Sequence, residues 1–357
     1  MSQRRRNVSG IEIYAQPAAL IGPYMHFAAA NSLNLLGRRA FCGRLAAGAG
    51  IASLAGLSAQ AALPEASEPF KLRFILASPM YGTTPLAEVL DEAKKVGATA
   101  VDIWPLRHAN HREQMTELGD DRVSELLSER GLQLGAITRY DLGTARLIEE
   151  MPYAKRFNCK LLITGAPRRR GGDVKAEVKS FVASLQPQLA AAEAHDLTIG
   201  IENHSGTILD SPDAIRYFGE FADSPRLGIA LAPYHLPQDN ALIADVIDAL
   251  GEKLVFFQAW EHGRGCDKPM PKEEELQQLP GRGTLDFTAL LGALERVDYR
   301  GWTEIFMHPT PRGTAIHATT AEVTAEINRS RDYLQRCASR LSNRHSRQTI
   351  RSEAVTT

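Results

Sequence analysis

Two glutamates lie inside apolar runs of this sequence, where a carboxyl group is costly to bury. Glu202 lies near the end of the run 197–203, and Glu304 lies within the run 301–307. Removing an unpaired carboxylate from water is unfavourable, so such residues either form a buried ion pair or take part in chemistry. Because positioned carboxyl groups transfer protons, we interpret Glu202 and Glu304 as a catalytic acid–base pair.

Imidazole and aromatic side chains follow the same kind of run. Seven of the ten histidines come after predicted strand ends, at positions 108, 111, 204, 235, 262, 308 and 317. Such side chains suit a polar ligand, because imidazoles form hydrogen bonds with it and aromatic rings stack on sugar rings. The predicted substrate-binding residues are Asp102, Trp104, His108, His111, Tyr140, His204, His235, Trp260 and His262. The run Arg168 to Arg170 could clamp a carboxylate or phosphate, or could simply be solvated.

Eight short apolar runs must position these residues. Each run is almost continuously apolar, which is typical of strands buried on both faces of a parallel sheet. Segments with a helical period separate them; in one, Pro85 begins a predicted helix and Gly97 is placed to end it. The runs are 72–77, 99–104, 132–138, 160–166, 197–203, 226–232, 253–259 and 301–307.

Eight such units predict a single-domain α/β fold, the (β/α)8 or TIM barrel, over residues 70–337. The alternative is a doubly wound sheet, which typically carries a glycine-rich phosphate turn after its first strand. Here the sequence after the first run is SPMYGTTP, without that pattern. Because barrel chemistry sits at the carboxyl ends of the strands, the polar residues above are expected to face one cavity.

The flanking segments do not resemble domain sequence. Arg38 and Arg39 precede a run of small and apolar residues that ends in the A-x-A motif at positions 59–61. Residues 1–61 therefore resemble a twin-arginine (Tat) signal peptide with an extended n-region, and we expect Tat export to the periplasm or the medium without a stable membrane anchor. The alternative is an amphipathic anchor, and translation could begin at Met1 or Met25. Residues 338–357 are arginine-rich and polar, which predicts a disordered basic tail.

Composition excludes other classes of protein. The chain has 41 basic and 42 acidic residues and a formal net charge of −1, which argues against nucleic-acid binding. Its four cysteines, at positions 42, 159, 266 and 337, lie far apart and form no C-x-x-C pair. A zinc ribbon or a disulfide framework is therefore not expected.

The stretches LAEVLDEAKKVGATAVDIWP and RGTLDFTALLGALERVDYRGWTEI are similar to the sugar phosphate isomerase/epimerase family, also described as xylose isomerase-like TIM barrels. The run 283–287 together with Glu304 carries the most specific part of the likeness. The resemblance implies a divalent metal (manganese, magnesium or zinc) held by Glu, Asp, His and Glu on strands five to eight. It also implies that two glutamates move a proton through an enediolate.

Carried over residue by residue, the implied metal site is incomplete. Glu202 and Glu304 match the two glutamates, Ala232 stands where the family has aspartate, and Gln258 takes the place of histidine. His235, three residues beyond Ala232, could serve as a replacement ligand. The tentative metal set is therefore Glu202, Glu304, His235 and Gln258, a poor cage for a transition metal, which favours imidazole nitrogens.

Three functions fit these residues. The first is an exported sugar isomerase or epimerase that uses Glu202 and Glu304, with a degraded or rebuilt metal site. The second is a lyase or hydratase acting on oxidised sugars such as 3-keto-glycosides, and the third is a non-catalytic carbohydrate-binding barrel. In each case the partner is a small carbohydrate, and the resemblance adds the option of a homodimer.

Overall fold

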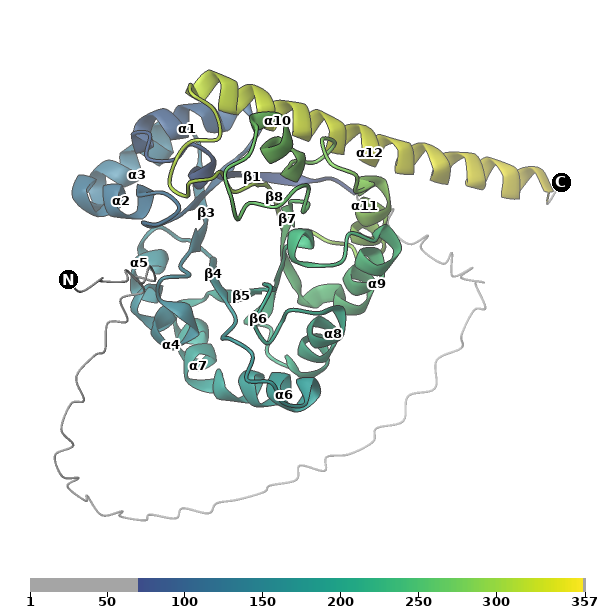
Figure 1. Cartoon of the computed structure of the whole chain (residues 1–357), viewed down its shortest axis with the longest axis horizontal. Helices are drawn as coiled ribbons and strands as arrows, with labels where there is room; N and C mark the ends of the chain where they lie inside the picture. Colours follow the sequence, from purple (N-terminus) through teal and green to yellow (C-terminus); the bar gives the residue numbers. More distant parts are fainter. Residues whose placement is uncertain (1–69, 356–357) are drawn as a thin grey trace, which may run out of the picture. The chain divides into compact units, whose positions relative to one another are not determined.

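Strands and helices alternate along residues 70–355, the part of the chain that the computed structural model describes (Figure 1). The predicted signal peptide, residues 1–61, lies outside this part. No helix among the described residues is both long enough and apolar enough to span a bilayer.

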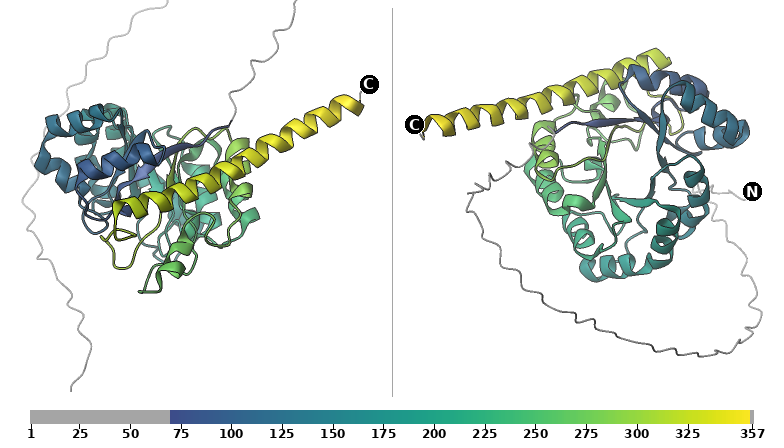
Figure 2. Two further views of the ribbon diagram at one scale, coloured as in Figure 1. Left: turned by 90° about the horizontal axis from the view of Figure 1, so that it is seen from above. Right: turned by 180° about the vertical axis from the view of Figure 1, so that it is seen from behind.

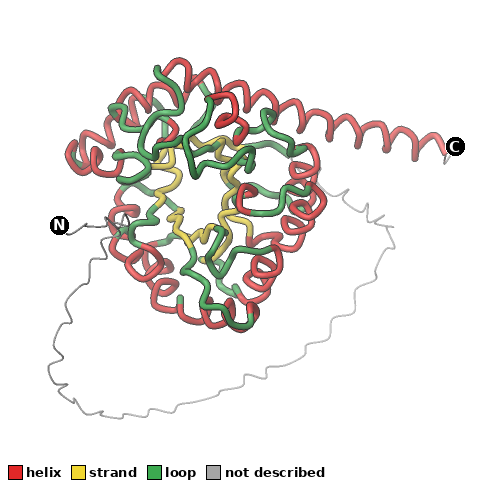
Figure 3. Tube along the Cα trace, in the orientation of Figure 1, coloured by secondary structure: helices red, strands yellow, loops and turns green. Residues whose placement is uncertain are grey.

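Eight parallel strands pair in chain order and close into a barrel when β8 pairs with β1 (Figure 3). The fold predicted from the sequence is therefore confirmed. The strands are β1 (Arg73–Ala77), β2 (Ala100–Ile103), β3 (Gln133–Thr138), β4 (Leu161–Gly165), β5 (Thr198–Glu202), β6 (Leu227–Leu231), β7 (Leu254–Ala259) and β8 (Trp302–Ile305).

Helices surround the ring of strands (Figure 3). They are α1 (Leu86–Lys95), α2 (His111–Leu118), α3 (Asp120–Glu129), α4 (Gly143–Arg146), α5 (Met151–Arg156), α6 (Val174–Ser184), α7 (Gln186–His195), α8 (Pro212–Phe221), α9 (Asn240–Leu250), α10 (Lys272–Glu275), α11 (Phe287–Arg296) and α12 (Thr320–Val355). Short 3₁₀ turns link several of these, at Ser78–Met80, Leu147–Glu149, Pro233–His235, Gly251–Lys253 and Leu276–Gln278.

Local sequence signals set the ends of these helices. The side chains of Asp173 and Ser211 accept hydrogen bonds from backbone amides in the first turns of α6 and α8. Pro85 directly precedes α1, and Gly97 follows its end with φ +71°. A positive φ of this size suits glycine, so the predicted end of this helix is confirmed.

The prediction of a disordered tail over residues 338–357 was wrong for most of that segment. Helix α12 begins beside α1, passes α11 and continues to Val355 (Figure 2). Its first half has an apolar face that includes Val323, Ile327 and Leu334, all buried against the barrel helices. The sequence from residue 320 onward contains neither glycine nor proline, so no residue type in it ends the helix.

Side chains inside the barrel form two layers. The lower layer is an apolar cluster that consists of Ile75, Ala100, Ala136, Leu161, Ile163, Ala230 and Phe256. Side chains two residues apart on a strand share a face, so Asp102, Thr138 and Gln258 lie one inward position beyond Ala100, Ala136 and Phe256. Together with Glu202 and Glu304 they form an upper layer of buried polar residues at the carboxyl ends of the strands.

Ala232 is the upper-layer member that follows Ala230 on the sixth unit, and it is fully buried. The side chain of Asn203 forms two hydrogen bonds with the backbone of Ala232. Asn203 Nδ2 donates to Ala232 O at 3.1 Å, and Ala232 N donates to Asn203 Oδ1 at 2.8 Å. The chain thus passes through the position where the resemblance implies an aspartate, but the side chain there is a methyl group.

The run 283–287 is anchored to the end of β7 by a buried carboxyl group. Glu261 Oε2 accepts a hydrogen bond from Leu285 N at 2.8 Å, and burial raises the pKa of Glu261 to about 7. A Cβ atom on Gly283 would lie only 2.2 Å from Glu261 Oε2. Glycine is therefore required here because the carboxyl group occupies the space of a side chain.

We predict that Gly283→Ala lowers the free energy of unfolding by about 2 kcal/mol, because the added methyl group must displace Glu261 or the backbone of Gln277. The matched control is Gly219→Ala in α8, where the new Cβ would meet Leu250 at an ordinary 3.5 Å. This control should be neutral or stabilising by up to about 1 kcal/mol, because alanine favours helix. Chemical unfolding of both variants measures the difference, and equal effects would contradict the steric explanation.

Candidate active site

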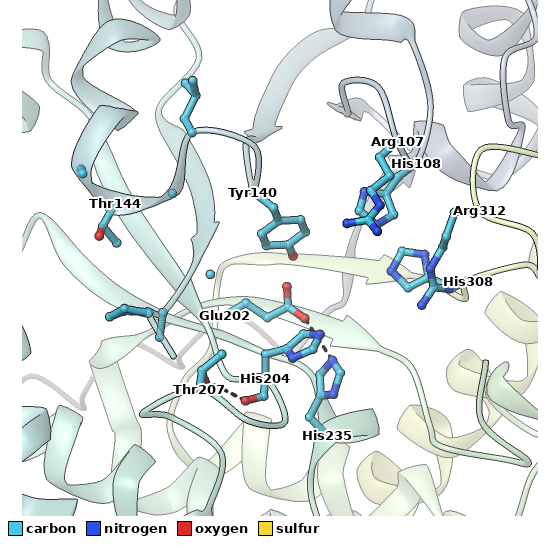
Figure 4. Close-up of a pocket in the computed structure, with 16 residues that line it drawn as sticks. Arg107, His108, Tyr140, Thr144, Glu202, His204, Thr207, His235, His308 and Arg312 are labelled. Carbon is cyan, nitrogen blue, oxygen red and sulfur yellow. Dashed lines mark hydrogen bonds and ion pairs between the residues drawn. The ribbon is translucent and has the colours of Figure 1, made fainter. Parts of the chain in front are cut away.

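A cavity of about 630 Å³ opens at the carboxyl ends of the strands (Figure 4). Loops after β2, β3, β4, β5, β6 and β8 form its wall, which is the usual place for a barrel enzyme's site. The lining residues are Arg107, His108, Tyr140, Leu142, Gly143, Thr144, Ala145, Gly165, Ala166, Pro167, Glu202, His204, Thr207, His235, His308 and Arg312.

Glu202 ends β5 and lines this cavity, although only 3% of the residue is exposed. Burial raises its pKa to about 8, and nearby His204 opposes the shift in part. His235 Nε2 lies 3.5 Å from Glu202 Oε1. Because burial lowers the pKa of His235 to about 3, its imidazole is neutral at pH 7 and this contact joins a neutral ring to the carboxyl group.

Glu304 lies in the upper layer of the barrel interior and is not among the lining residues. Gln258 Nε2 donates to Glu304 Oε2 at 3.2 Å, and the two residues face each other in the β7–β8 register. The side chain of Gln258 therefore points into the barrel. Burial, together with nearby Asp102, raises the pKa of Glu304 well above its usual range.

Asp102 belongs to the same buried layer. Its Oδ2 accepts hydrogen bonds from Trp104 Nε1 and Thr138 Oγ1, both at 2.7 Å. Burial also raises the pKa of Asp102. Asp102 Oδ1 and Glu304 Oε1 have no hydrogen-bond partner among the described side chains, so a proton retained on either carboxyl group would supply the missing donor.

Four predicted substrate-binding residues line the cavity, namely His108, Tyr140, His204 and His235. His108 stacks on His308 with ring centroids 4.8 Å apart, and His204 lies against His235 at 3.9 Å. Burial lowers the pKa of His108 to about 4 and that of His308 well below its usual value. The imidazoles of His108 and His308 are therefore uncharged at pH 7 and can both donate and accept hydrogen bonds.

Three other predicted binding residues belong to the framework instead. Asp102 and Trp104 bond to each other, and Trp104 also stacks on Phe306 with ring centroids 5.0 Å apart. His111 begins α2, where its Nε2 lies 2.9 Å from the carbonyl oxygen of Thr84. These three residues do not line the cavity, because each side chain is buried against a partner of its own.

Trp260 and His262 also lie outside the cavity lining. Trp260 is buried, donates from Nε1 to Gln278 Oε1 at 3.1 Å and stacks on Tyr234 at 4.0 Å. His262 lies beyond it on an exposed loop, with its ring tilted against Tyr234 at 4.8 Å. The expectation that Trp260 stacks on a sugar ring was wrong, because Tyr234 already covers that face.

The sequence interpretation missed two arginines in the cavity wall, Arg107 and Arg312. A signal was present, since Arg107 directly precedes His108 and Arg312 lies four residues after His308. Predicted strand ends locate loops, but they do not tell which of two adjacent side chains faces inward.

The comparison with protein-family models is decisive for classification. Residues 90–336, more than half of the chain, match the model described as "Xylose isomerase-like TIM barrel". The chain belongs to this family. Among curated proteins, no sequence match was found.

Solved structures share the barrel of this family member at low sequence identity. The zinc-bound IolI protein has a TM-score of 0.59 and 16% identity, over 74% of this chain and 99% of its own. D-allulose 3-epimerase from Methylomonas sp. in complex with D-allulose has a TM-score of 0.54 and 16% identity, over 75% and 98%. The probable 3-DHS dehydratase AsbF from Bacillus anthracis has 0.53 and 14%, over 72% and 97%. These likenesses establish the fold.

The residues of this family member do not fit a four-ligand metal site. Ala232 offers no donor atom, and the amide of Gln258 is turned with its N–H toward Glu304, the side that repels a cation. No group of three or more His, Cys, Asp or Glu side chains in the described part of the chain is arranged to hold a metal ion. The donors that remain, two carboxyl groups and one imidazole, lie in different surroundings, since Glu304 is outside the cavity lining.

We predict that the double variant Ala232→Asp/Gln258→His binds Mn²⁺ at least about tenfold more tightly than the parent, because it restores the ligand types of the family. Isothermal titration calorimetry on the purified proteins measures the affinity. The control adds Glu202→Gln to the double variant and should lose the gain. A parent protein that binds Mn²⁺ as tightly as the double variant would show that Gln258 and His235 already complete a site.

Proposed function

We propose that this chain is an exported enzyme that isomerises a sugar or sugar derivative by proton transfer, with Glu202 as its acid–base residue. One observation carries the proposal: of the described residues that line the cavity, Glu202 alone has a carboxyl group. Its raised pKa of about 8 suits a group that must both take and return a proton near neutral pH. Membership of the family is consistent with such chemistry.

The proposed reaction needs one base. Ionised Glu202 removes the proton from a carbon next to a carbonyl group, and the C–H electron pair becomes the C=C bond of an enediolate while negative charge collects on the carbonyl oxygen. Imidazole N–H groups of His235 and His308 can stabilise that oxygen. The hydroxyl group on the deprotonated carbon gives its proton to the former carbonyl oxygen, a transfer that an imidazole of the cavity can relay. The oxygen that lost this proton forms the new C=O bond, while the C=C electron pair takes the proton back from Glu202 at the former carbonyl carbon. The carbonyl group has then moved by one position.

This proposal changes the role first expected for Glu304. A two-base epimerase needs acid–base groups on opposite faces of one carbon, and Glu304 is buried beneath the cavity rather than in its wall. We propose that Glu304, held by Gln258, supports the polar layer beneath Glu202.

A lyase acting on a keto-sugar is the second candidate, and the histidines favour it. Elimination needs a base and a donor that protonates the leaving hydroxyl, and the cavity pairs one carboxyl group with His108, His204, His235 and His308. The non-catalytic sugar-binding alternative has less support, because Trp104 and Trp260 are packed into the framework.

Export remains a proposal from the sequence. The paired arginines at 38 and 39 and the A-x-A motif at 59–61 support transport by the Tat machinery to the periplasm or the medium. Outside the cytoplasm, free or glycosidic sugars and sugar acids are more common substrates than sugar phosphates. The family resemblance also suggests that the protein could form a homodimer.

We predict that Glu202→Gln lowers turnover by about 100- to 10,000-fold, the usual contribution of a general acid–base group. The control Glu220→Gln alters an exposed carboxylate on α8 and should retain full activity. Both proteins are incubated with candidate aldoses, ketoses and keto-glycosides in D₂O, and the products are examined by NMR. An isomerase places deuterium on the carbon that receives the proton, whereas a lyase forms an unsaturated product. Equal turnover by Glu202→Gln and the parent would remove Glu202 from the mechanism.

We predict that kcat/KM rises about tenfold per pH unit below pH 8 and levels off above it. The pKa of Glu202 is raised to about 8, so the carboxyl group is mostly protonated at pH 7 and gains its basic form as the pH increases. Initial rates between pH 5.5 and 9.5 measure the profile. A profile that is flat from pH 5.5 upward would contradict a base with this pKa.

A further inference from the structure

Two guanidinium groups lie on one side of the cavity. Figure 4 shows Arg107 beside His108 and Arg312 beside His308, across the cavity from Tyr140 and Glu202. Arg107 comes from the loop after β2 and Arg312 from the loop after β8, and these strands both neighbour β1 in the barrel. Both positive charges therefore face the same space.

Neither guanidinium group has a carboxylate partner among the described residues. Arg312 is partly buried, and two other partly buried arginines do have one: Arg112 pairs with Glu150 at 2.5 Å and Arg139 with Asp141 at 2.7 Å. Arg312 instead donates from one nitrogen, Nη2, to Cys266 Sγ at 3.1 Å. Its other terminal nitrogen, Nη1, is buried without a hydrogen-bond partner. A buried cationic N–H without an acceptor is costly, so an acceptor is expected to come from outside the chain.

The rest of the lining does not neutralise these charges. Glu202 is the sole carboxyl group among the described lining residues, and burial keeps it mostly protonated at pH 7. Burial lowers the pKa of His108 to about 4, with Arg312 and Arg107 adding to the shift, and lowers the pKa of His235 to about 3, so these two imidazoles add no charge at pH 7. The cavity thus carries a net positive charge at neutral pH before a ligand enters.

The backbone holds Arg107 in place at some cost. Its φ is +98°, which is unfavourable for a residue with a side chain. The preceding amide, Leu106 N, donates to both carboxylate oxygens of Glu113, at 3.1 and 3.2 Å. From the other loop, Gly313 approaches Arg107 so closely that a Cβ atom on it would lie 3.1 Å from Arg107 O. Strain of this kind is retained where the surroundings fix the residue, and it is frequent at ligand sites.

We propose that the ligand of this cavity is an anionic sugar derivative whose carboxylate or phosphate group is bound by Arg107 and Arg312, while its reacting carbon faces Glu202. The identification of the reacting carbon rests on the proposed function, but binding of the anion does not. The run Arg168 to Arg170, which the sequence offered for this role, contributes Arg168 and Arg170 to a separate cavity of about 470 Å³.

The test is binding by calorimetry with three probes of similar size: D-gluconate, D-glucose 6-phosphate and neutral D-glucose. The full chain is used, and the measurement is made at pH 7 and low salt. We expect one or both anions to bind at least about tenfold more tightly than glucose, with affinity that falls as salt is added. A preference for gluconate identifies a carboxylate site, and a preference for the phosphate identifies a phosphate site.

Matched variants locate the site. Arg107→Gln and Arg312→Gln should each weaken binding of the preferred anion by about tenfold to a hundredfold, the usual effect of losing a charged hydrogen-bond partner. Arg264→Gln removes the same charge from an exposed side chain outside the cavity and should leave the affinity unchanged. Because Arg107 is exposed, its variant tests the site even if Arg312→Gln folds poorly.

Two outcomes would overturn the proposal: anions that bind no better than glucose, or anion binding that survives both arginine substitutions. The same titrations with Glu202→Gln keep this proposal separate from the proposed function. If anion binding depends on the arginines but no turnover depends on Glu202, the anion site is supported and the proposed isomerase function is contradicted.

Discussion

Closure of eight strands into one barrel is the constraint on which the site depends. Once the ring is closed, every second side chain must point inward, and the interior can hold only stacked layers. The apolar cluster around Ile75 and Phe256 fills the lower layer, so polar residues are left to the positions nearest the carboxyl ends. Glu202 and Glu304 both belong to this polar layer, yet of the two only Glu202 lines the cavity.

The sequence predicted the strands, the family and the end of the barrel that carries the site, because continuous apolar runs and the alternation of units are local signals. From the same runs it proposed Glu202 and Gln258 as site residues, and the structure places Glu202 in the cavity lining and Gln258 against Glu304. It did not reveal that Trp260 is covered by Tyr234 or that His111 is turned toward Thr84. Those outcomes depend on partners from other segments, which a linear pattern does not contain.

The conformation of the loops was the second feature that the sequence did not predict. Arg107 points into the cavity from a residue with positive φ, and its conformation is fixed by Glu113 and by Gly313 from a distant loop. The C-terminal segment showed the opposite error, because its polar composition suggested disorder while the same residues lack any helix-ending type. In both cases composition was a weaker guide than the conformations that each residue type allows.

The position of Ala232 illustrates how a barrel tolerates the loss of a ligand. Asn203 binds the Ala232 backbone at both its N–H and its C=O groups, so the register between β5 and β6 does not rely on the side chain at that position. The carboxyl group of Glu202 therefore keeps its place whether or not an aspartate stands beside it.

The separation of the charged groups from the acid–base residue has a consequence for how such a protein can diverge. Glu202 is fixed by a strand and by the layer beneath it, whereas Arg107 and Arg312 come from the loops after β2 and β8. Loops accept substitutions and changes of length far more readily than barrel strands. Substitutions in these loops can therefore replace the arginines, and so change which charged group of a substrate is bound, without disturbing proton transfer by Glu202. Because a Cβ atom on Gly313 would lie only 3.1 Å from Arg107 O, however, changes in one loop are constrained by the other.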